Sequence, residues 1–111
     1  MMKLPHRDKA YIPRAKLTDY LLSLTHAVGR SKARFFRSMG YDRENVDLLE
    51  EQLLTMARVA DVTTVTSSPY GIKYVIDGTL LTPAGGMVRG QTIWILETGN
   101  DRPRFVTAYP V

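Results

Sequence analysis

His26 is the residue of this sequence whose type and neighbours best suit acid–base chemistry. It lies in a predicted connector and is followed by Arg30 and Lys32. A histidine can transfer protons near neutral pH. The two cations can hold a phosphate at the start of a helix, where backbone N–H groups also favour anions. The alternative is a histidine that caps a helix end, with Lys32 in solvent.

A second group of candidates lies near the C-terminus, where Arg104, Thr107 and Tyr109 share a predicted strand. Residues two apart in a strand point to the same side, so Thr107 and Tyr109 present two hydroxyls and one aromatic ring together. Tyrosine can stack on a base and exchange a proton, and Arg104 can bind phosphate. The alternative is an ordinary terminal strand in which Tyr109 packs on Pro83 or Trp94.

Three further residues complete the candidate substrate contacts. Lys73 stands beside Tyr74, and Trp94 offers a ring on which a base can stack. The sequence has no P-loop, no dinucleotide-binding glycine fingerprint and no His-Glu-x-x-His motif. It has no cysteine and two histidines, so we expect neither a metal site nor a cofactor.

The basic residues are concentrated in the first third of the chain. Residues 1–40 hold nine Lys and Arg against two acids, a net charge of +7, whereas residues 41–61 carry −4. The whole chain carries +4. A basic face of this kind can attract a polyanion such as RNA. The alternative is a solvated helix face.

Length and composition indicate one globular domain. The chain has 111 residues, of which 44% are hydrophobic and 23% charged. No apolar run is long enough to span a membrane, and the first residues lack the apolar core of a signal peptide. We therefore expect no membrane partner and a cytoplasmic location; the oligomeric state stays open.

These candidates need a scaffold of helices followed by strands. Residues 1–13 are expected to form an irregular arm, and residues 14–111 a single domain. We expect helices over about 14–24, 31–39 and 43–58, and strands over 62–66, 72–81, 87–96 and 104–109. Gly40 suits the end of the second helix and Asp42 the start of the third. The fold class is α+β, with about three N-terminal helices packed on one face of a four-stranded antiparallel β-meander.

Strict alternation predicts which side chains share a face of the sheet. It groups Phe105 with Thr107 and Tyr109, opposite Ala108. It also places Trp94 opposite Ile93.

Residues 26–36 resemble an H-x-V-G-R-x-K-A-x-F-F signature of a small bacterial family of unknown function. The same family shares Gly71-x-Lys73-Tyr74 and an ending of the form Trp94…Gly99…Pro103-Arg104-Phe105-Val106-Thr107-Ala108-Tyr109-Pro110. The resemblance covers most of residues 14–110. More distantly, the chain is similar to the barnase–EndoU–colicin–RelE group of small ribonucleases, which includes toxin domains with N-terminal helices before a four-stranded antiparallel sheet.

The distant resemblance implies a metal-independent endoribonuclease of a toxin–antitoxin or related conflict system, with RNA as substrate and a small antitoxin or immunity-type protein as partner. The matching positions are His26, Lys32, Lys73, Arg104, Thr107 and Tyr109. His26 or Tyr109 takes the proton of a 2′-hydroxyl, whose oxygen attacks the adjacent phosphate, and Lys or Arg stabilises the charge. The alternative function is a non-catalytic module that binds RNA or a protein.

Overall fold

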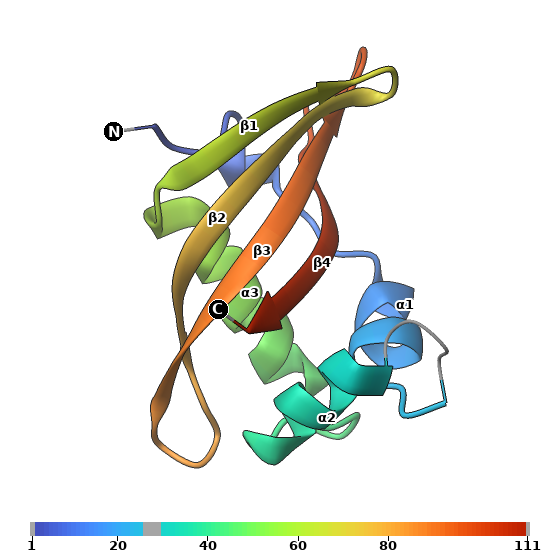
Figure 1. The fold of residues 1–111 in the computed structure, drawn as a ribbon, viewed down its shortest axis with the longest axis vertical. Coiled ribbons are helices and arrows are strands. Elements are labelled where there is room, and N and C mark those ends of the chain that lie inside the picture. The colour runs from blue at the N-terminus through green and yellow to red at the C-terminus, as the bar shows by residue number, and fades with distance from the viewer. Residues whose placement is uncertain (1, 26–29, 111) are drawn as a thin grey trace.

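The four strands pair in sequence order and form one antiparallel sheet (Figure 1). The computed structural model describes residues 2–25 and 30–110. The strands are β1 (Val62–Ser68), β2 (Gly71–Leu81), β3 (Met87–Glu97) and β4 (Arg104–Pro110). Short turns join them, so the predicted meander is confirmed.

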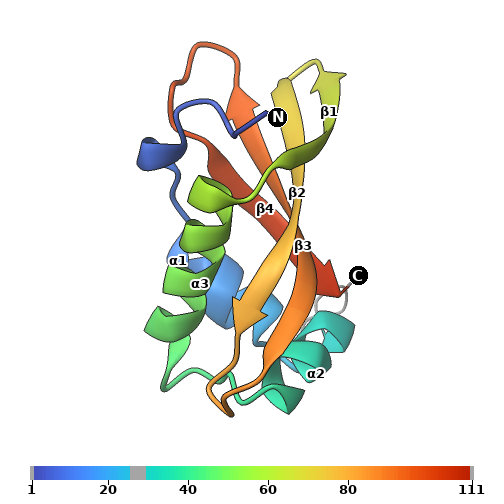
Figure 2. The same cartoon turned by 90° about the vertical axis from the view of Figure 1, so that its left-hand side faces the viewer.

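Helical segments precede the sheet, which confirms the α+β class. They are η1 (Arg7–Lys9), α1 (Arg14–Lys16), the π-helix η2 (Leu17–Leu21), α2 (Arg30–Ser38) and α3 (Val46–Val59). Figure 2 shows α1 and α3 on one side of the sheet, whereas α2 lies beyond the C-terminal end of β4 and toward the other side. The helical layer therefore leaves most of the second face of the sheet open.

Helix α3 begins three residues later than the sequence pattern predicted. Asp42 does not cap it directly. Its carboxylate accepts hydrogen bonds from the backbone N–H groups of Glu44 and Asn45, at 2.8 and 3.1 Å. Asp42 thus stabilises the turn ahead of the helix, because a short acidic side chain readily bonds the backbone two or three residues on.

The core lies between α3 and the covered face of the sheet, which we call the inner face. Leu53 and Met56 of α3 are buried there. Trp94 is fully buried and packs edge-on against Phe105, with ring centroids 5.3 Å apart. The Trp94 Nε1–H donates to Thr92 Oγ1 at 2.9 Å, so its polar atom is satisfied inside the core.

Two glycines permit close backbone approaches around this core. A Cβ on Gly78 would lie 2.7 Å from Cγ of Met56, so the glycine lets α3 approach β2. A Cβ on Gly71 would lie 2.3 Å from the carbonyl oxygen of Leu96, and its φ of +149° also disfavours other residues. Gly71 thus sets the start of β2, two residues before Lys73.

A bulge in β4 overturns the predicted grouping of its side chains. Thr107 pairs with Ile93, whereas Phe105 pairs with Trp94, so Val106 is an extra residue in β4. An inserted residue shifts the alternation by one position. Phe105 therefore faces the core, and Thr107 lies on the opposite, outer face. The prediction that they share a face is wrong.

The N-terminal segment packs along the sheet. The backbone N–H of Tyr11 donates to the carbonyl oxygen of Pro103, and that of Phe105 donates to the carbonyl of Tyr11, both at 3.0 Å. Leu4 is fully buried in the core. The segment before α1 thus extends the hydrophobic core and lines the start of β4. Within residues 2–25 and 30–110, none of the helices has the length and apolar character that a membrane span requires.

Candidate functional site

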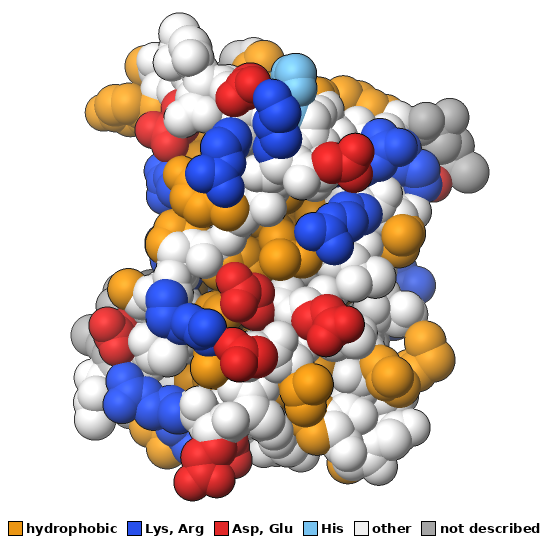
Figure 3. Space-filling view, turned by 180° about the vertical axis from the view of Figure 1, so that it is seen from behind, with side chains coloured by type: hydrophobic (Ala, Val, Ile, Leu, Met, Phe, Trp, Pro, Cys, Tyr) orange, Lys and Arg blue, Asp and Glu red, His pale blue; other side chains and the backbone are white. Residues whose placement is uncertain are grey.

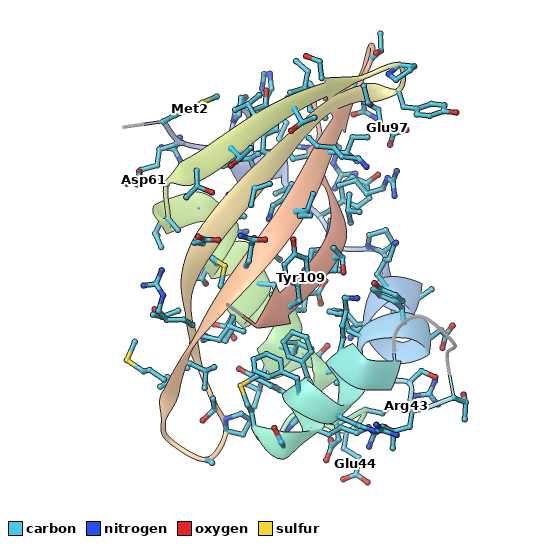
Figure 4. The ribbon with its side chains drawn as sticks, viewed as in Figure 1. Met2, Arg43, Glu44, Asp61, Glu97 and Tyr109 are labelled. Atoms are coloured by element: carbon cyan, nitrogen blue, oxygen red, sulfur yellow. The ribbon has the colours of Figure 1, made fainter. Side chains whose placement is uncertain are left out.

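The outer face of β4 carries three of the predicted site residues in a row. Arg104, Thr107 and Tyr109 lie opposite Ile95, Ile93 and Gln91 of β3. Along the unbulged partner strand β3, each step spans two residues, or about 7 Å, so Arg104 and Tyr109 are about 13 Å apart. Figure 4 shows Tyr109 near the C-terminal end of β4, far from Glu97 at the end of β3. Thr107 occupies the middle of the row.

Thr107 is joined to the helical layer by a hydrogen bond. The phenol oxygen of Tyr20 lies 3.0 Å from Thr107 Oγ1. Two ammonium groups lie over the Tyr20 ring: Lys16 Nζ is 5.2 Å from its centroid, and Lys32 Nζ is 5.7 Å. Cations at this distance are attracted by the negative face of the ring. Two hydroxyls and two cations from four elements (α1, η2, α2 and β4) thus meet at this edge of the sheet.

Local structure explains how Tyr20 and Lys32 come together. The i→i+5 bond from the Leu22 N–H to the Leu17 carbonyl, at 2.8 Å, closes the wide turn of η2 that carries Tyr20. Arg37 of α2 then donates from Nε and Nη2 to the carbonyl of Leu22, at 3.0 and 2.8 Å. This fork holds α2 against the end of η2 and so places Lys32 over the ring.

A second group of polar residues lies at the Arg104 end of the row. Arg104 Nε donates to Glu97 Oε1 at 3.0 Å. Lys73 is exposed on β2 and lies opposite Ile95, which in turn lies opposite Arg104. Lys73 and Arg104 border an open pocket of about 360 Å³ that Lys16 also lines. Lys16 therefore belongs to both groups, and we call the residues Lys16, Tyr20, Lys32, Lys73, Arg104 and Thr107 the basic strip.

The basic strip is only partly neutralised. No ion pair joins Lys16, Lys32 or Lys73 to any residue within 2–25 and 30–110, whereas Arg104 is paired with Glu97. The helix-covered side differs in charge from the basic strip, because acidic side chains gather over α3 there (Figure 3). Lys73 is exposed and Lys16 and Lys32 are partly buried. Such unpaired cations, gathered in one region of the surface, attract an anionic ligand to it.

Other predicted residues do not join the strip. His26 lies outside the described residues, as does the side chain of Arg30. Trp94 is 0% exposed and Tyr74 5% exposed, so neither offers a ring to a ligand. The two rings face the core because Tyr74 and Trp94 pair with each other on the inner face of β2 and β3. Tyr109 shares the outer face with Thr107, so it cannot pack on Trp94.

Sequence reasoning missed Lys16 and Tyr20. Their i, i+4 spacing on a predicted helix was a usable signal, since such residues lie on one helix face. It also missed Tyr70, an exposed aromatic at the β1–β2 turn. For metals, the described part of the chain holds no cluster of three His, Cys, Asp or Glu side chains able to bind an ion.

A family model described as "Domain of unknown function (DUF6883)" matches residues 3–111. The chain belongs to this family. The match covers nearly the whole DUF6883 chain, including every element of the basic strip. The search of curated proteins found no match for it.

A solved structure has the same fold as this DUF6883 domain. A chain of the "Contact-dependent growth inhibition toxin - immunity protein complex from Klebsiella pneumoniae 342" superposes on it with a TM-score of 0.72. The superposition covers 95% of this chain and 96% of that chain, at 16% sequence identity. Identity at this level shows a shared fold, and function must be argued from the site.

Proposed function

We propose that this protein is a toxin-like, metal-independent endoribonuclease of a bacterial toxin–antitoxin or related conflict system. The observation that carries the proposal is the Tyr20–Thr107 hydrogen bond at an open sheet face, with Lys16 and Lys32 over the Tyr20 ring. A fold shared with a chain of a toxin–immunity complex supports the same class. The enzyme would meet its RNA in the cytoplasm.

The reaction needs a base, cations and a proton for the leaving group. A base removes the proton of a ribose 2′-hydroxyl, and the 2′-oxygen attacks the adjacent phosphorus. The bond from phosphorus to the 5′-oxygen breaks, and that oxygen takes up a proton. The products are a 2′,3′-cyclic phosphate and a 5′-hydroxyl. Negative charge grows on the phosphoryl oxygens during attack, and cations already in place stabilise it.

The described residues suit these roles differently. Lys16 and Lys32 lie over the ring of Tyr20, whose phenol oxygen contacts Thr107, so a phosphate bound beside this pair would receive both charge and hydrogen bonds. His26 is the candidate base from the sequence, and Tyr109, about 7 Å along β4 from Thr107, is the alternative. Arg104 is about 7 Å from Thr107 in the other direction, which suits a neighbouring phosphate.

The test is cleavage of total RNA by the purified protein in EDTA, beside His26→Ala and Lys32→Ala variants. We expect defined fragments ending in 2′,3′-cyclic phosphate. Lys32→Ala should lower the rate by about 10²-fold, as for loss of one group that stabilises transition-state charge. Arg58→Ala, which removes an exposed cation from α3, is the matched control and should cleave normally. Intact RNA with folded wild-type protein would overturn the proposal.

We propose as partner a small antitoxin or immunity-type protein whose acidic surface covers the basic strip. The unpaired lysines of the basic strip support this choice, because opposite charges raise association rates and set orientation. A candidate is an acidic protein encoded beside this gene. Its complex should weaken with added salt and with Lys16→Glu, and should exclude RNA. Simultaneous binding of RNA and partner would contradict the proposed surface.

A non-catalytic binding module is the second candidate, and one observation favours protein binding. Two adjoining hollows between α3 and the β2–β3 hairpin carry four exposed apolar side chains, those of Leu48, Val59, Leu81 and Met87. Hydrophobic side chains are visible on this helix-covered face (Figure 3). Exposed apolar clusters often mark protein contacts. A folded protein that leaves RNA intact in the EDTA assay and loses its protein partner on Met87→Glu would support this candidate.

A further inference from the structure

The pocket at the Arg104 end of the outer face combines an apolar floor with a charged rim. Its volume is about 360 Å³, within the range of small-ligand sites. Ile95 and Val106 supply the apolar surface. Ile95 is only 5% exposed although no helix covers this face, because neighbouring side chains shield it. The floor is therefore partly protected from water before any ligand binds.

The rim carries an aromatic ring and three cations. Tyr70, at the β1–β2 turn, is 77% exposed and lines the pocket. Lys16, Lys73 and Arg104 line it as well. The one carboxylate, that of Glu97, is held by Arg104 Nε at 3.0 Å, so its charge is compensated. A flat apolar group with an attached anion matches this combination.

We propose that this pocket binds the base of the nucleotide next to the cleaved phosphate of an RNA substrate. The inference rests on the proposed function. Tyr70 supplies the stacking surface, and Ile95 and Val106 contact the ring from below. A base has an aromatic face whatever its identity, so stacking tolerates any sequence. Single-stranded RNA fits better than a duplex, because its bases are free to leave the stack.

Lys16 connects the pocket to the Tyr20–Thr107 pair. It lines the pocket, and its Nζ lies 5.2 Å from the centroid of the Tyr20 ring. A nucleotide whose base occupies the pocket can thus direct its phosphate toward Lys16 and Thr107. Lys73 and Arg104 remain available for the phosphate on the other side of that nucleotide. The pocket therefore sets which phosphodiester bond reaches Thr107.

The test is binding of a non-cleavable probe, so that it does not depend on catalysis. A mixed-sequence RNA tetranucleotide with 2′-O-methyl groups is titrated into ¹⁵N-labelled protein and followed by NMR. We expect shifts at Ile95, Val106 and Lys73. Tyr70→Ala should weaken binding about tenfold, a typical effect of losing one stacking contact. Arg89→Ala, which removes an exposed cation of β3 outside the pocket, is the control and should bind with little change.

The outcomes separate this inference from the proposed ribonuclease. Tyr70-dependent binding without cleavage of ordinary RNA would support the pocket and overturn the enzyme. Cleavage in EDTA with the same KM for wild type and Tyr70→Ala would support the enzyme and overturn the pocket. Chemical shift changes confined to other surfaces would also overturn the pocket. The same would follow if an oligoglutamate peptide caused equal shift changes and Tyr70→Ala did not alter them.

Discussion

The phenol oxygen of Tyr20 and Oγ1 of Thr107 lie 3.0 Å apart, although 87 positions separate the two residues in the chain. The contact joins η2 to the bulged strand β4. It exists because the extra residue at Val106 turns Thr107 to the outer face, within reach of the helical segment. The lysines over the Tyr20 ring then make this contact the centre of the basic strip.

Removing the Tyr20–Thr107 hydrogen bond should cost a modest amount of stability. Tyr20→Phe and Thr107→Val each keep the shape of the side chain and remove its hydroxyl. We expect each to lower the free energy of unfolding by about 1 kcal/mol, with a coupling of about 0.5–1 kcal/mol between them. Urea unfolding of the two single variants and the double variant measures this coupling. Fully additive effects would mean that the two hydroxyls do not interact in solution.

Arg37 should act as a positioning residue for Lys32. Arg37→Ala removes the two hydrogen bonds to the carbonyl of Leu22. It should lower the free energy of unfolding by about 1.5–3 kcal/mol, as for hydrogen bonds to a charged group. Binding of the non-cleavable RNA should weaken as well, because α2 no longer holds Lys32 over Tyr20. Arg37→Lys, which keeps the charge without the fork, should restore only part of the binding.

Arg34→Ala provides the control for this prediction, since Arg34 is exposed on the same helix. It should leave stability nearly unchanged. Equal RNA binding by folded Arg37→Ala and wild-type protein would show that Lys32 is placed without this fork.

Gly78→Ala should destabilise the protein despite being a small change. The added Cβ would lie 2.7 Å from Cγ of the buried Met56, so α3 or the side chain must shift. Overpacking of this kind typically lowers the free energy of unfolding by about 1–3 kcal/mol. Thermal unfolding should show a clear loss that becomes much smaller when Gly78→Ala is made in a Met56→Ala background. A stabilised Gly78→Ala single variant would contradict this account of the α3–β2 contact.

Trp94 should report on the core rather than on RNA. It is the single tryptophan of the chain, and it is fully buried against Phe105. We expect its fluorescence to be shifted to short wavelength, and to be little quenched by iodide in the folded protein. Addition of the non-cleavable RNA should leave the spectrum nearly unchanged. A base stacked on Trp94 would instead quench it strongly.

The link between Lys9 and Asp101 should depend on pH in the acid range. The hydrogen bond from Lys9 Nζ, 2.6 Å from Asp101 Oδ2, holds the pKa of Asp101 below its ordinary value, and the charge of Lys9 acts in the same direction. The pKa of the folded form is thus lower than that of the unfolded form. The stabilising contribution is present above the unfolded pKa and is lost as pH falls through the folded pKa.

Carboxyl NMR of Asp101 tests this directly, with Lys9→Met as the comparison. The variant should titrate at a higher pH than the wild type. An identical midpoint in both proteins would mean that the contact between Lys9 and Asp101 does not persist in solution.

Periodic patterns were reliable where the backbone stayed regular. Repeats of β-branched residues and short turn segments predicted four strands, and their order followed from the turns. In β3, alternation correctly placed Trp94 and Ile93 on opposite faces, because the strand pairs with β2 without a bulge. The faces of β2 were not predicted. Alternation failed in β4, because a single inserted residue at Val106 exchanges the two faces.

Tyr74 and Trp94 were predicted to contact a ligand, but both are buried in the core. An aromatic side chain packs well in a core and also stacks well on a base, so residue type alone does not separate the two. The helix α3 decided the matter by covering the face on which both rings lie. Tyr70 escaped notice because it sits in a turn without a pattern around it.

The fold class, the strand order and the excess of positive charge near the N-terminus follow from the amino-acid sequence, because they depend on local periodicity and composition. Which hydroxyls and cations meet depends on how the elements pack in three dimensions. Tyr20 reaches Thr107, and Lys16 joins the pocket beside Arg104, because a π-turn, a bulge and the Arg37 fork set the relative positions of η2, α2 and β4. Such contacts depend on shifts of single residues, which periodicity does not record.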